Sequence, residues 1–160
     1  MAVNKLMLDG FAEDDYKLIA IHSSIEAYKL AFFLNKTLSI KLEREVYDVD
    51  FSHKEGIAYY QLFSYLNENL CCNYYLVSNK YKLNPEEVIV SNGLFPEEGK
   101  VNTNLIYEYK SVDFFLKIED DTDSVSLKKL LININKIQQV VTAYSIEVST
   151  LKSNKNLIFN

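Results

Sequence analysis

An order of hydrophobic patterns typical of strand, helix and strand occurs twice in the chain. In its first occurrence, apolar β-forming residues fill positions 16–21, and apolar residues then recur at helical spacing from Ala27 to Leu34. Residues 38–42 next alternate between apolar and polar side chains, which is the period of a half-buried strand. Residues 15–44 therefore predict a β-α-β unit.

The same order returns over residues 112–151. A β-branched and aromatic run at 112–118 is followed by apolar residues at helical spacing between Leu127 and Ile137, and residues 140–151 have the pattern of a final strand. Two split β-α-β units are typical of a ferredoxin-like sandwich, in which two helices cover one face of an antiparallel sheet. We therefore predict an α+β fold of this kind.

Residues 47–110 are predicted to be an insertion between the two units. Their apolar stretches at 57–66 and 70–78 predict a β-hairpin that enlarges the sheet. Residues 79–104 hold both prolines and two of the four glycines, so we expect an irregular and labile segment there. With 160 residues, the whole chain has the size of one domain, and we predict a single domain.

The composition limits the classes of function. The net charge is -5 and only one of the 17 basic residues is an arginine, so we do not expect nucleic-acid binding, which needs a basic patch. The apolar runs are far shorter than the roughly 20 residues of a membrane span, and the N-terminal residues lack a signal-peptide pattern. The only cysteines, Cys71 and Cys72, are adjacent, which disfavours a disulfide between them. We therefore expect a cytoplasmic protein.

No recognised catalytic, cofactor or metal motif occurs in the sequence. The two histidines and the adjacent cysteines have none of the spacings of structural zinc sites. There is neither a glycine-rich phosphate loop nor a nucleophile elbow. We predict no catalytic, cofactor-binding or metal-binding residues.

Two polar clusters have a structural and a functional interpretation. Ser23 followed by Glu26 is the pattern of a capping box at the start of the first helix, whereas His22 beside a helix N-terminus would suit an anion site. Four carboxylates at 119–123 precede the second helix, where they would offset the helix dipole, although clustered oxygens also suit a divalent cation. We favour capping in both places.

Residues 106–114, with the sequence IYEYKSVDF, resemble the signature of the bacterial IPExxxVDY family of small proteins. Residues 5–9 and 16–24 are also similar to that family, so the resemblance extends through most of the chain. Tyr107 stands where the signature has proline, and Phe114 stands where it has tyrosine. The family is uncharacterised, so the resemblance implies no activity. The matching positions are Ile106, Glu108, Val112 and Asp113.

The two acidic signature residues, Glu108 and Asp113, have two interpretations. In the structural one, they tie a bend before a strand to neighbouring backbone donors. In the functional one, they form a ligand or metal site. We favour the structural interpretation, because the apolar signature residues interleaved with them are typical of strand packing.

The predicted first helix has apolar residues on two sides. At about 100° per residue, Ile25, Tyr28 and Phe32 lie nearly opposite the side that packs on the sheet. A helix on a sheet needs one apolar stripe, so we expect something to cover these three residues. The cover is either intramolecular, from residues 79–104 or the tail at 157–159, or it is a second chain. Ile25, Tyr28 and Phe32 are the candidate interface.

The sequence favours a non-catalytic interaction or adaptor protein that is a homodimer or part of a larger assembly. Its expected partner is another protein or a second copy of the chain, and not a membrane. One alternative is a small-ligand sensor similar in topology to ACT domains, whose ferredoxin-like sheets bind metabolites at dimer interfaces. A second alternative is an enzyme with an unrecognised active site.

Overall fold

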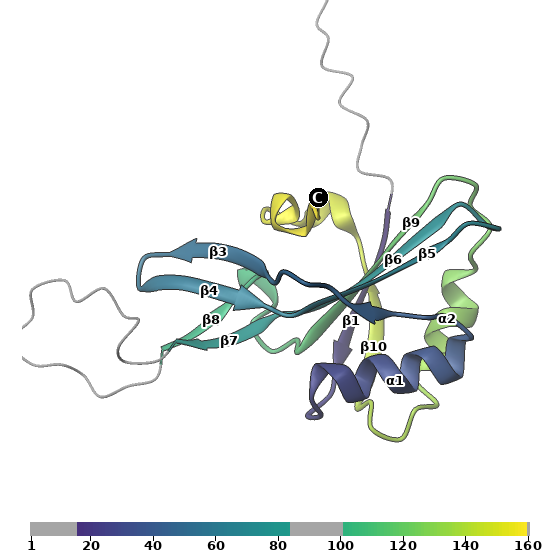
Figure 1. Cartoon of the computed structure of the whole chain (residues 1–160), viewed down its shortest axis with the longest axis horizontal. Helices are drawn as coiled ribbons and strands as arrows, with labels where there is room; N and C mark the ends of the chain where they lie inside the picture. Colours follow the sequence, from purple (N-terminus) through teal and green to yellow (C-terminus); the bar gives the residue numbers. More distant parts are fainter. Residues whose placement is uncertain (1–15, 84–100, 160) are drawn as a thin grey trace, which may run out of the picture.

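The centre of the fold is a six-stranded sheet, seen in a computed structural model that describes residues 16–83 and 101–159. In spatial order its strands are β10 (Thr142–Ile146), β1 (Tyr16–His22), β9 (Phe114–Asp120), β6 (Cys72–Ser78), β5 (Leu62–Asn67) and β2 (Glu43–Arg44). Each strand is antiparallel to its neighbours (Figure 1). The predicted α+β class with an antiparallel sheet is confirmed.

The strand order is consistent with the predicted ferredoxin-like arrangement, but one strand comes from an unexpected place in the sequence. β9 lies between β1 and β6, and β10 lies on the other side of β1. We predicted a half-buried strand over residues 38–42, and that prediction is wrong, because the strand after α1 is the short β2 at the edge of the sheet. In a split β-α-β arrangement the strand after the first helix would lie beside β9. β6, from the inserted hairpin, takes that place.

The side chain of Asn35 holds the segment in which the strand was predicted. Leu42 donates its N–H to Asn35 Oδ1 at 2.7 Å and accepts a hydrogen bond at its carbonyl from Asn35 Nδ2 at 3.0 Å. These two hydrogen bonds tie the backbone of Leu42 to α1. Ile40 and Leu42 are still buried, so the apolar alternation reports burial without strand pairing.

Two helices, α1 (Ala27–Leu38) and α2 (Leu127–Ile134), cover one face of the sheet (Figure 1). The predicted inner side of the first helix is confirmed, because its apolar residues are buried against the strands. We call this core the helix-side cluster. Its fully buried aliphatic members are Ile19, Ile21, Leu30, Leu34, Leu76, Leu116, Ile118 and Ile134.

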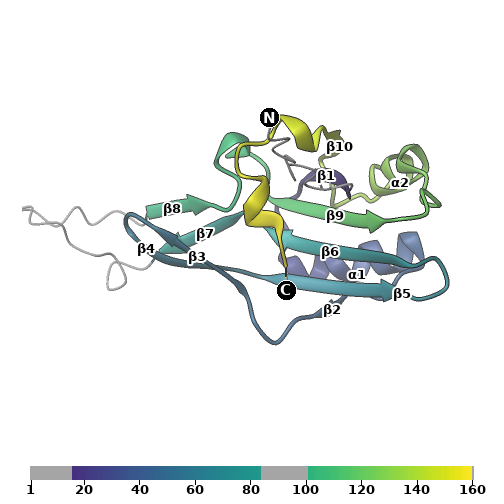
Figure 2. The same ribbon diagram turned by 90° about the horizontal axis from the view of Figure 1, so that it is seen from above.

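The opposite face of the sheet is covered by parts of the predicted insertion and by the C-terminal segment. Two hairpins contribute, namely β3 (Val49–His53) with β4 (Gly56–Tyr60), and β7 (Lys80–Leu83) with β8 (Val101–Asn104). Short 3₁₀ helices follow as η1 (Tyr107–Tyr109), η2 (Val148–Thr150) and η3 (Asn154–Leu157). Figure 2 shows α1 and the C-terminal segment on opposite sides of the sheet.

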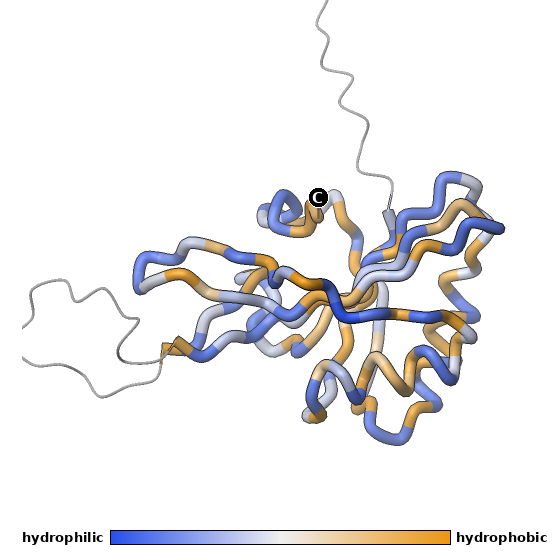
Figure 3. Tube along the Cα trace, in the orientation of Figure 1, coloured by the Kyte–Doolittle hydropathy of each residue, from blue (hydrophilic) through white to orange (hydrophobic). Residues whose placement is uncertain are grey.

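This second layer has its own core, which we call the far-side cluster. Strand residues contribute to it at positions that alternate with those facing the helices, so the central strands are apolar on both sides. Figure 3 shows hydrophobic residues where the strands converge and hydrophilic residues at the tips of the β3–β4 and β5–β6 hairpins. The best buried members of the far-side cluster are Leu18, Ala20, Ala58, Tyr60, Val77, Leu105, Ile106, Val112, Phe115 and Leu157.

The insertion agrees with the sequence prediction in part. The predicted hairpin is confirmed over β5 and β6, but its first strand is interrupted at Gln61, because β4 pairs with β3 in a separate sheet. Residues 79–104, predicted to be irregular, begin and end with the paired strands β7 and β8. The remainder of that segment, 84–100, lies outside the described residues.

Candidate functional site

The outer side of α1 presents two aromatic residues to the surface. The side chains of Tyr28 and Phe32 are 61% and 62% exposed, although the opposite side of the same helix is buried on the sheet. Ile25 precedes the helix and is partly buried against the helix-side cluster. The exposed part of the candidate interface therefore consists of Tyr28 and Phe32.

Neither described segment that we considered as an intramolecular cover lies on this side of the sheet. Leu157 is buried in the far-side cluster, and the ring of Phe159 packs against that of Tyr75 with 5.3 Å between centroids. β7 and β8 also belong to the far-side layer, where Tyr81 of β7 packs against the far-side cluster. The aromatic pair on α1 is therefore left without an intramolecular cover among the described residues.

Charged residues border the aromatic pair. Glu26, just before α1, forms an ion pair with Lys29 at 2.7 Å between Oε2 and Nζ, and this pair holds the pKa of Glu26 below its ordinary value. Lys36 lies in the last turn of the helix. The exposed face thus has an acidic residue before its first turn and a basic residue in its last turn.

The predicted capping box at the start of α1 is wrong. Ser23 Oγ donates a hydrogen bond to the carbonyl of Gln139 at 2.7 Å, and its N–H donates to Asp113 Oδ2 at 2.9 Å. Glu26 occupies the cap position and makes no side-chain capping bond. Ser23 therefore joins the two β-α-β units to each other and does not cap the helix. In His22, the residue of the alternative anion site, the Nε2 atom lies 3.3 Å from the hydroxyl oxygen of Tyr144.

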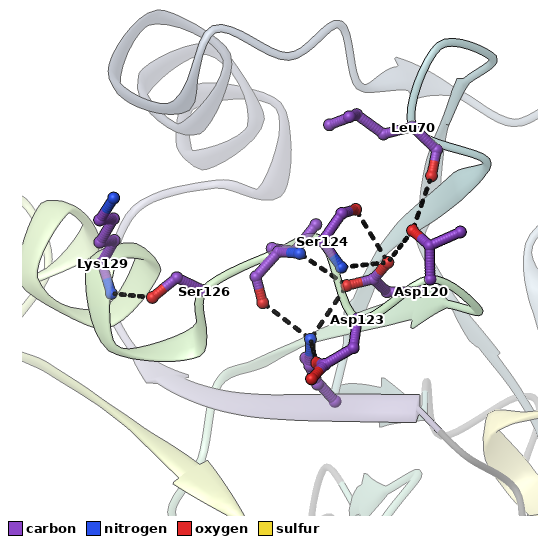
Figure 4. A network of polar contacts seen from close by, with 9 residues as sticks. Leu70, Asp120, Asp123, Ser124, Ser126 and Lys129 are labelled. Carbon is purple, nitrogen blue, oxygen red and sulfur yellow. Dashed lines mark hydrogen bonds and ion pairs between the residues drawn. The ribbon is translucent and has the colours of Figure 1, made fainter.

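The predicted acidic cap of the second helix is also wrong. Glu119 and Asp120 belong to β9, and Ser126 caps α2 by accepting a hydrogen bond from the Lys129 N–H at 3.4 Å. Asp120 is buried and accepts hydrogen bonds from the Val125 N–H at 2.7 Å and from Lys17 Nζ at 2.9 Å. Figure 4 shows Ser124 beside the same carboxylate, which accepts the Ser124 N–H and hydroxyl at 3.1 Å each. Burial raises the pKa of Asp120, but these hydrogen bonds outweigh burial and hold it well below its ordinary range.

The four signature residues lie at the junction between the sheet and the far-side layer. Ile106 and Val112 are fully buried in the far-side cluster. The carboxylate of Glu108 accepts hydrogen bonds from the backbone N–H groups of Lys152 and Ser153 at 2.7 and 2.9 Å, and from the Ser153 hydroxyl. These contacts are of the kind that the structural interpretation describes.

Asp113 makes a corresponding pair of contacts on the other side of the signature segment. Its carboxylate accepts the Ser23 N–H at 2.9 Å and a hydrogen bond from Lys80 Nζ at 2.6 Å. One acidic signature residue thus attaches the segment to the C-terminal residues, and the other attaches it to the end of β1.

Asn79 is a structural centre that the sequence analysis missed. It is fully buried, and its Nδ2 donates to the carbonyls of Tyr109 and Val112, both at 2.9 Å. Its Oδ1 accepts the Ile106 N–H at 2.8 Å. An asparagine between two apolar strand patterns is the signal that could have indicated this role, because a buried amide must find several partners.

Comparisons with protein-family models, with curated proteins and with solved structures find no match for this chain. Within residues 16–83 and 101–159, no helix is long and apolar enough to cross a membrane. Over the same residues, no three His, Cys, Asp or Glu side chains gather closely enough to hold a metal ion.

Proposed function

We propose that this protein is a non-catalytic interaction protein that self-associates through the outer side of α1. The observation that carries the proposal is the exposure of Tyr28 and Phe32, each about 60% exposed on a helix whose other side is buried. Tyrosine and phenylalanine are enriched in the buried centres of protein interfaces. A second protomer would remove both rings from water.

The charges on α1 favour a second copy of the same chain as the partner. In a two-fold dimer the same surface of each copy meets its equivalent, and the two helices run antiparallel. The midpoint between Tyr28 and Phe32 is position 30, and the midpoint between Glu26 and Lys36 is position 31. The two midpoints therefore lie one residue, or about 1.5 Å, apart along the helix. One two-fold axis therefore brings the aromatic residues together and places Glu26 of each copy, which pairs with Lys29 of its own chain, level with the other copy's Lys36 along the helix axis.

The size of this face indicates a weak dimer. A stable interface buries about 800 Å² on each partner, which is more than one short helix with two aromatic residues supplies. We therefore expect association that depends on protein concentration, and not an obligate dimer. A cytoplasmic location and membership of the IPExxxVDY family also remain proposals; the free thiols of Cys71 and Cys72 support the former.

Analytical ultracentrifugation of Phe32→Lys tests the proposal. We expect the wild type to dimerise with rising concentration and the variant to dimerise at least about tenfold more weakly, because a central anchor is lost. Its free energy of unfolding should stay within about 0.5 kcal/mol of the wild-type value. Tyr47→Lys is the matched control, since Tyr47 is 83% exposed and lies between β2 and β3, outside α1. A wild type that stays monomeric at every concentration contradicts the proposal.

Charge reversal separates a second copy from any other partner. Glu26→Lys and Lys36→Glu alone should each weaken the dimer about threefold to tenfold, because each places like charges opposite one another at two symmetry-related positions. The double variant restores both pairs between copies and should regain most of the affinity. If the double variant is weaker than both single variants, the antiparallel pairing of α1 is wrong.

A small-ligand sensor is the second candidate function. The observation that favours it is a groove with basic residues on the far side of the sheet.

A further inference from the structure

A cavity of about 460 Å³ lies on the far-side layer, where four separate parts of the chain meet. Its walls come from the β3–β4 hairpin, from β8, from the signature segment around η1 and from the C-terminal segment. We call it the basic groove, after the residues at its walls that carry charge or a titratable ring: Lys110, Lys152, Lys155, His53 and Glu55. The volume suits a small organic molecule, since ligand pockets span about 300–1,000 Å³.

The charge of the groove is opposite to that of the protein. The chain has a net charge of -5, yet three lysines and one glutamate line the groove, which gives the lining a charge of 3 - 1 = +2. Among the described residues, none of these three lysines forms an ion pair. A phosphate monoester carries a charge of about -1.5 to -2 near neutral pH, which matches this lining better than a single carboxylate does.

Hydrogen bonds fix the tautomer of His53. The Tyr81 carbonyl can only accept, so Thr103 Oγ1 donates to it at 3.3 Å, and the Tyr60 hydroxyl donates to Thr103 Oγ1 at 3.1 Å. His53 Nε2 lies 2.8 Å from the Tyr60 oxygen, whose own proton is already used, so Nε2 is protonated and donates to that oxygen. Burial lowers the pKa of His53, which favours the neutral ring. Nδ1 is therefore the acceptor nitrogen of the ring.

Apolar side chains complete the lining. Phe51 and Tyr107 contribute rings, and Tyr107 is 53% exposed. The signature residue Glu108 holds Lys152 and Ser153 by their backbone N–H groups, so it fixes one lysine-bearing wall against the segment that carries Lys110. We infer that the basic groove binds a small organic phosphate, with the phosphate group on the lysines and the apolar part against Phe51 and Tyr107.

Three probes test the chemical class of the ligand, namely phenyl phosphate, inorganic phosphate and benzoate. Each is titrated into isotope-labelled protein while the backbone amide signals of Lys110 and Ser153 are followed by NMR. We expect saturable binding of phenyl phosphate, about threefold or more tighter than inorganic phosphate because of the ring contacts. Phenyl phosphate should also bind about threefold or more tighter than benzoate, because of its additional charge. No saturation with phenyl phosphate, or benzoate binding equally well, overturns the inference.

Lysine variants test the location. Lys110→Met and Lys152→Met should each weaken phenyl phosphate binding about threefold, and together about tenfold. Lys152→Met keeps its backbone bond to Glu108, so the wall stays in place. Lys128→Met, on α2 and the other face of the sheet, is the control and should bind as the wild type does. Equal loss in the control and the groove variants would locate binding elsewhere. Phe32→Lys should also bind normally, which keeps this test separate from self-association.

Discussion

Asn35 and Asn135 make the same pair of hydrogen bonds at the ends of the two helices. Asn35 clamps the N–H and carbonyl of Leu42, as described above. Asn135 accepts the Ala143 N–H at Oδ1 and donates from Nδ2 to the Ala143 carbonyl, both at 2.9 Å. Ala143 lies in β10, an outer strand of the sheet. The two β-α-β units thus share a side-chain clamp as well as an order of elements.

We expect Asn135→Ala and Asn35→Ala each to lower the free energy of unfolding by about 1–3 kcal/mol. Each change leaves a backbone N–H and carbonyl without their partners in a partly buried place. Urea denaturation measures the effect. Asn133→Ala is the control, and an equal loss in the control would contradict the role of the clamp.

Asp120→Asn should lower stability by about 2–3 kcal/mol at neutral pH, because the hydrogen bonds to the charged carboxylate and the ion pair with Lys17 are weakened. Asp120 has a depressed pKa in the folded protein, so its contribution is complete above the unfolded pKa of about 4 and is lost as the pH falls below that. The difference between wild type and variant should therefore shrink from pH 6 toward about pH 2. Denaturation curves at several pH values measure it.

Asp123→Asn is the control for this pH dependence. Asp123 also pairs with Lys17, at 2.7 Å, but its side chain is 91% exposed. Its stability curve should run parallel to that of the wild type. If the difference between wild type and Asp120→Asn is the same at every pH, the ionised carboxylate is not what stabilises this loop.

Glu108→Ala should loosen the C-terminal segment. The change removes the acceptor of the Lys152 and Ser153 N–H groups and leaves the buried Ser153 hydroxyl without its partner. We expect these two amides to exchange with solvent about tenfold faster, which corresponds to roughly 1.4 kcal/mol. Hydrogen exchange measured by NMR gives the rates. Glu147→Gln serves for comparison, and unchanged exchange in Glu108→Ala would refute the contact.

The two cysteines should react at different rates. Cys71 is exposed in the turn after β5, whereas Cys72 is fully buried in β6, and burial raises the pKa of its thiol. A thiol-specific reagent should modify one cysteine rapidly in the native protein and both under denaturing conditions. Mass spectrometry of peptides identifies the site. Finding no free thiol in the denatured, unreduced protein would show that the cysteines are oxidised.

Sequence periodicity predicted the features that depend on one element at a time. The buried side of α1 follows from its 3.6-residue period, and the exposed position of Phe32 follows from the same geometry. The predicted caps at the starts of the two helices were wrong. Ser23 forms a hydrogen bond with Gln139, which is distant in the sequence, and Asp120 accepts one from Val125 in the loop that follows it. A local capping pattern cannot reveal such competing partners.

The basic groove could not be predicted from local sequence patterns, for a different reason. Lys110 and Lys152 come from segments that are far apart in the sequence, and each is ordinary in its own surroundings. The break at Gln61, after which the chain passes from the sheet of β4 to that of β5, could not be predicted from the sequence either. Apolar side chains continue on both sides of it. Both features follow from how strands pair, and one sequence does not encode pairing locally.

The place of β1 between β9 and β10 has a consequence for the growing chain on the ribosome. Its neighbours β9 and β10 are synthesised much later, as the 103 positions between Lys17 and its partner Asp120 illustrate. At about 5–20 residues per second, β1 waits roughly 5 to 20 s for its first neighbour. During that interval a strand that is finally buried on both faces is open to solvent. The nascent chain thus exposes an apolar segment that chaperones can bind until β9 has been synthesised and pairs with β1.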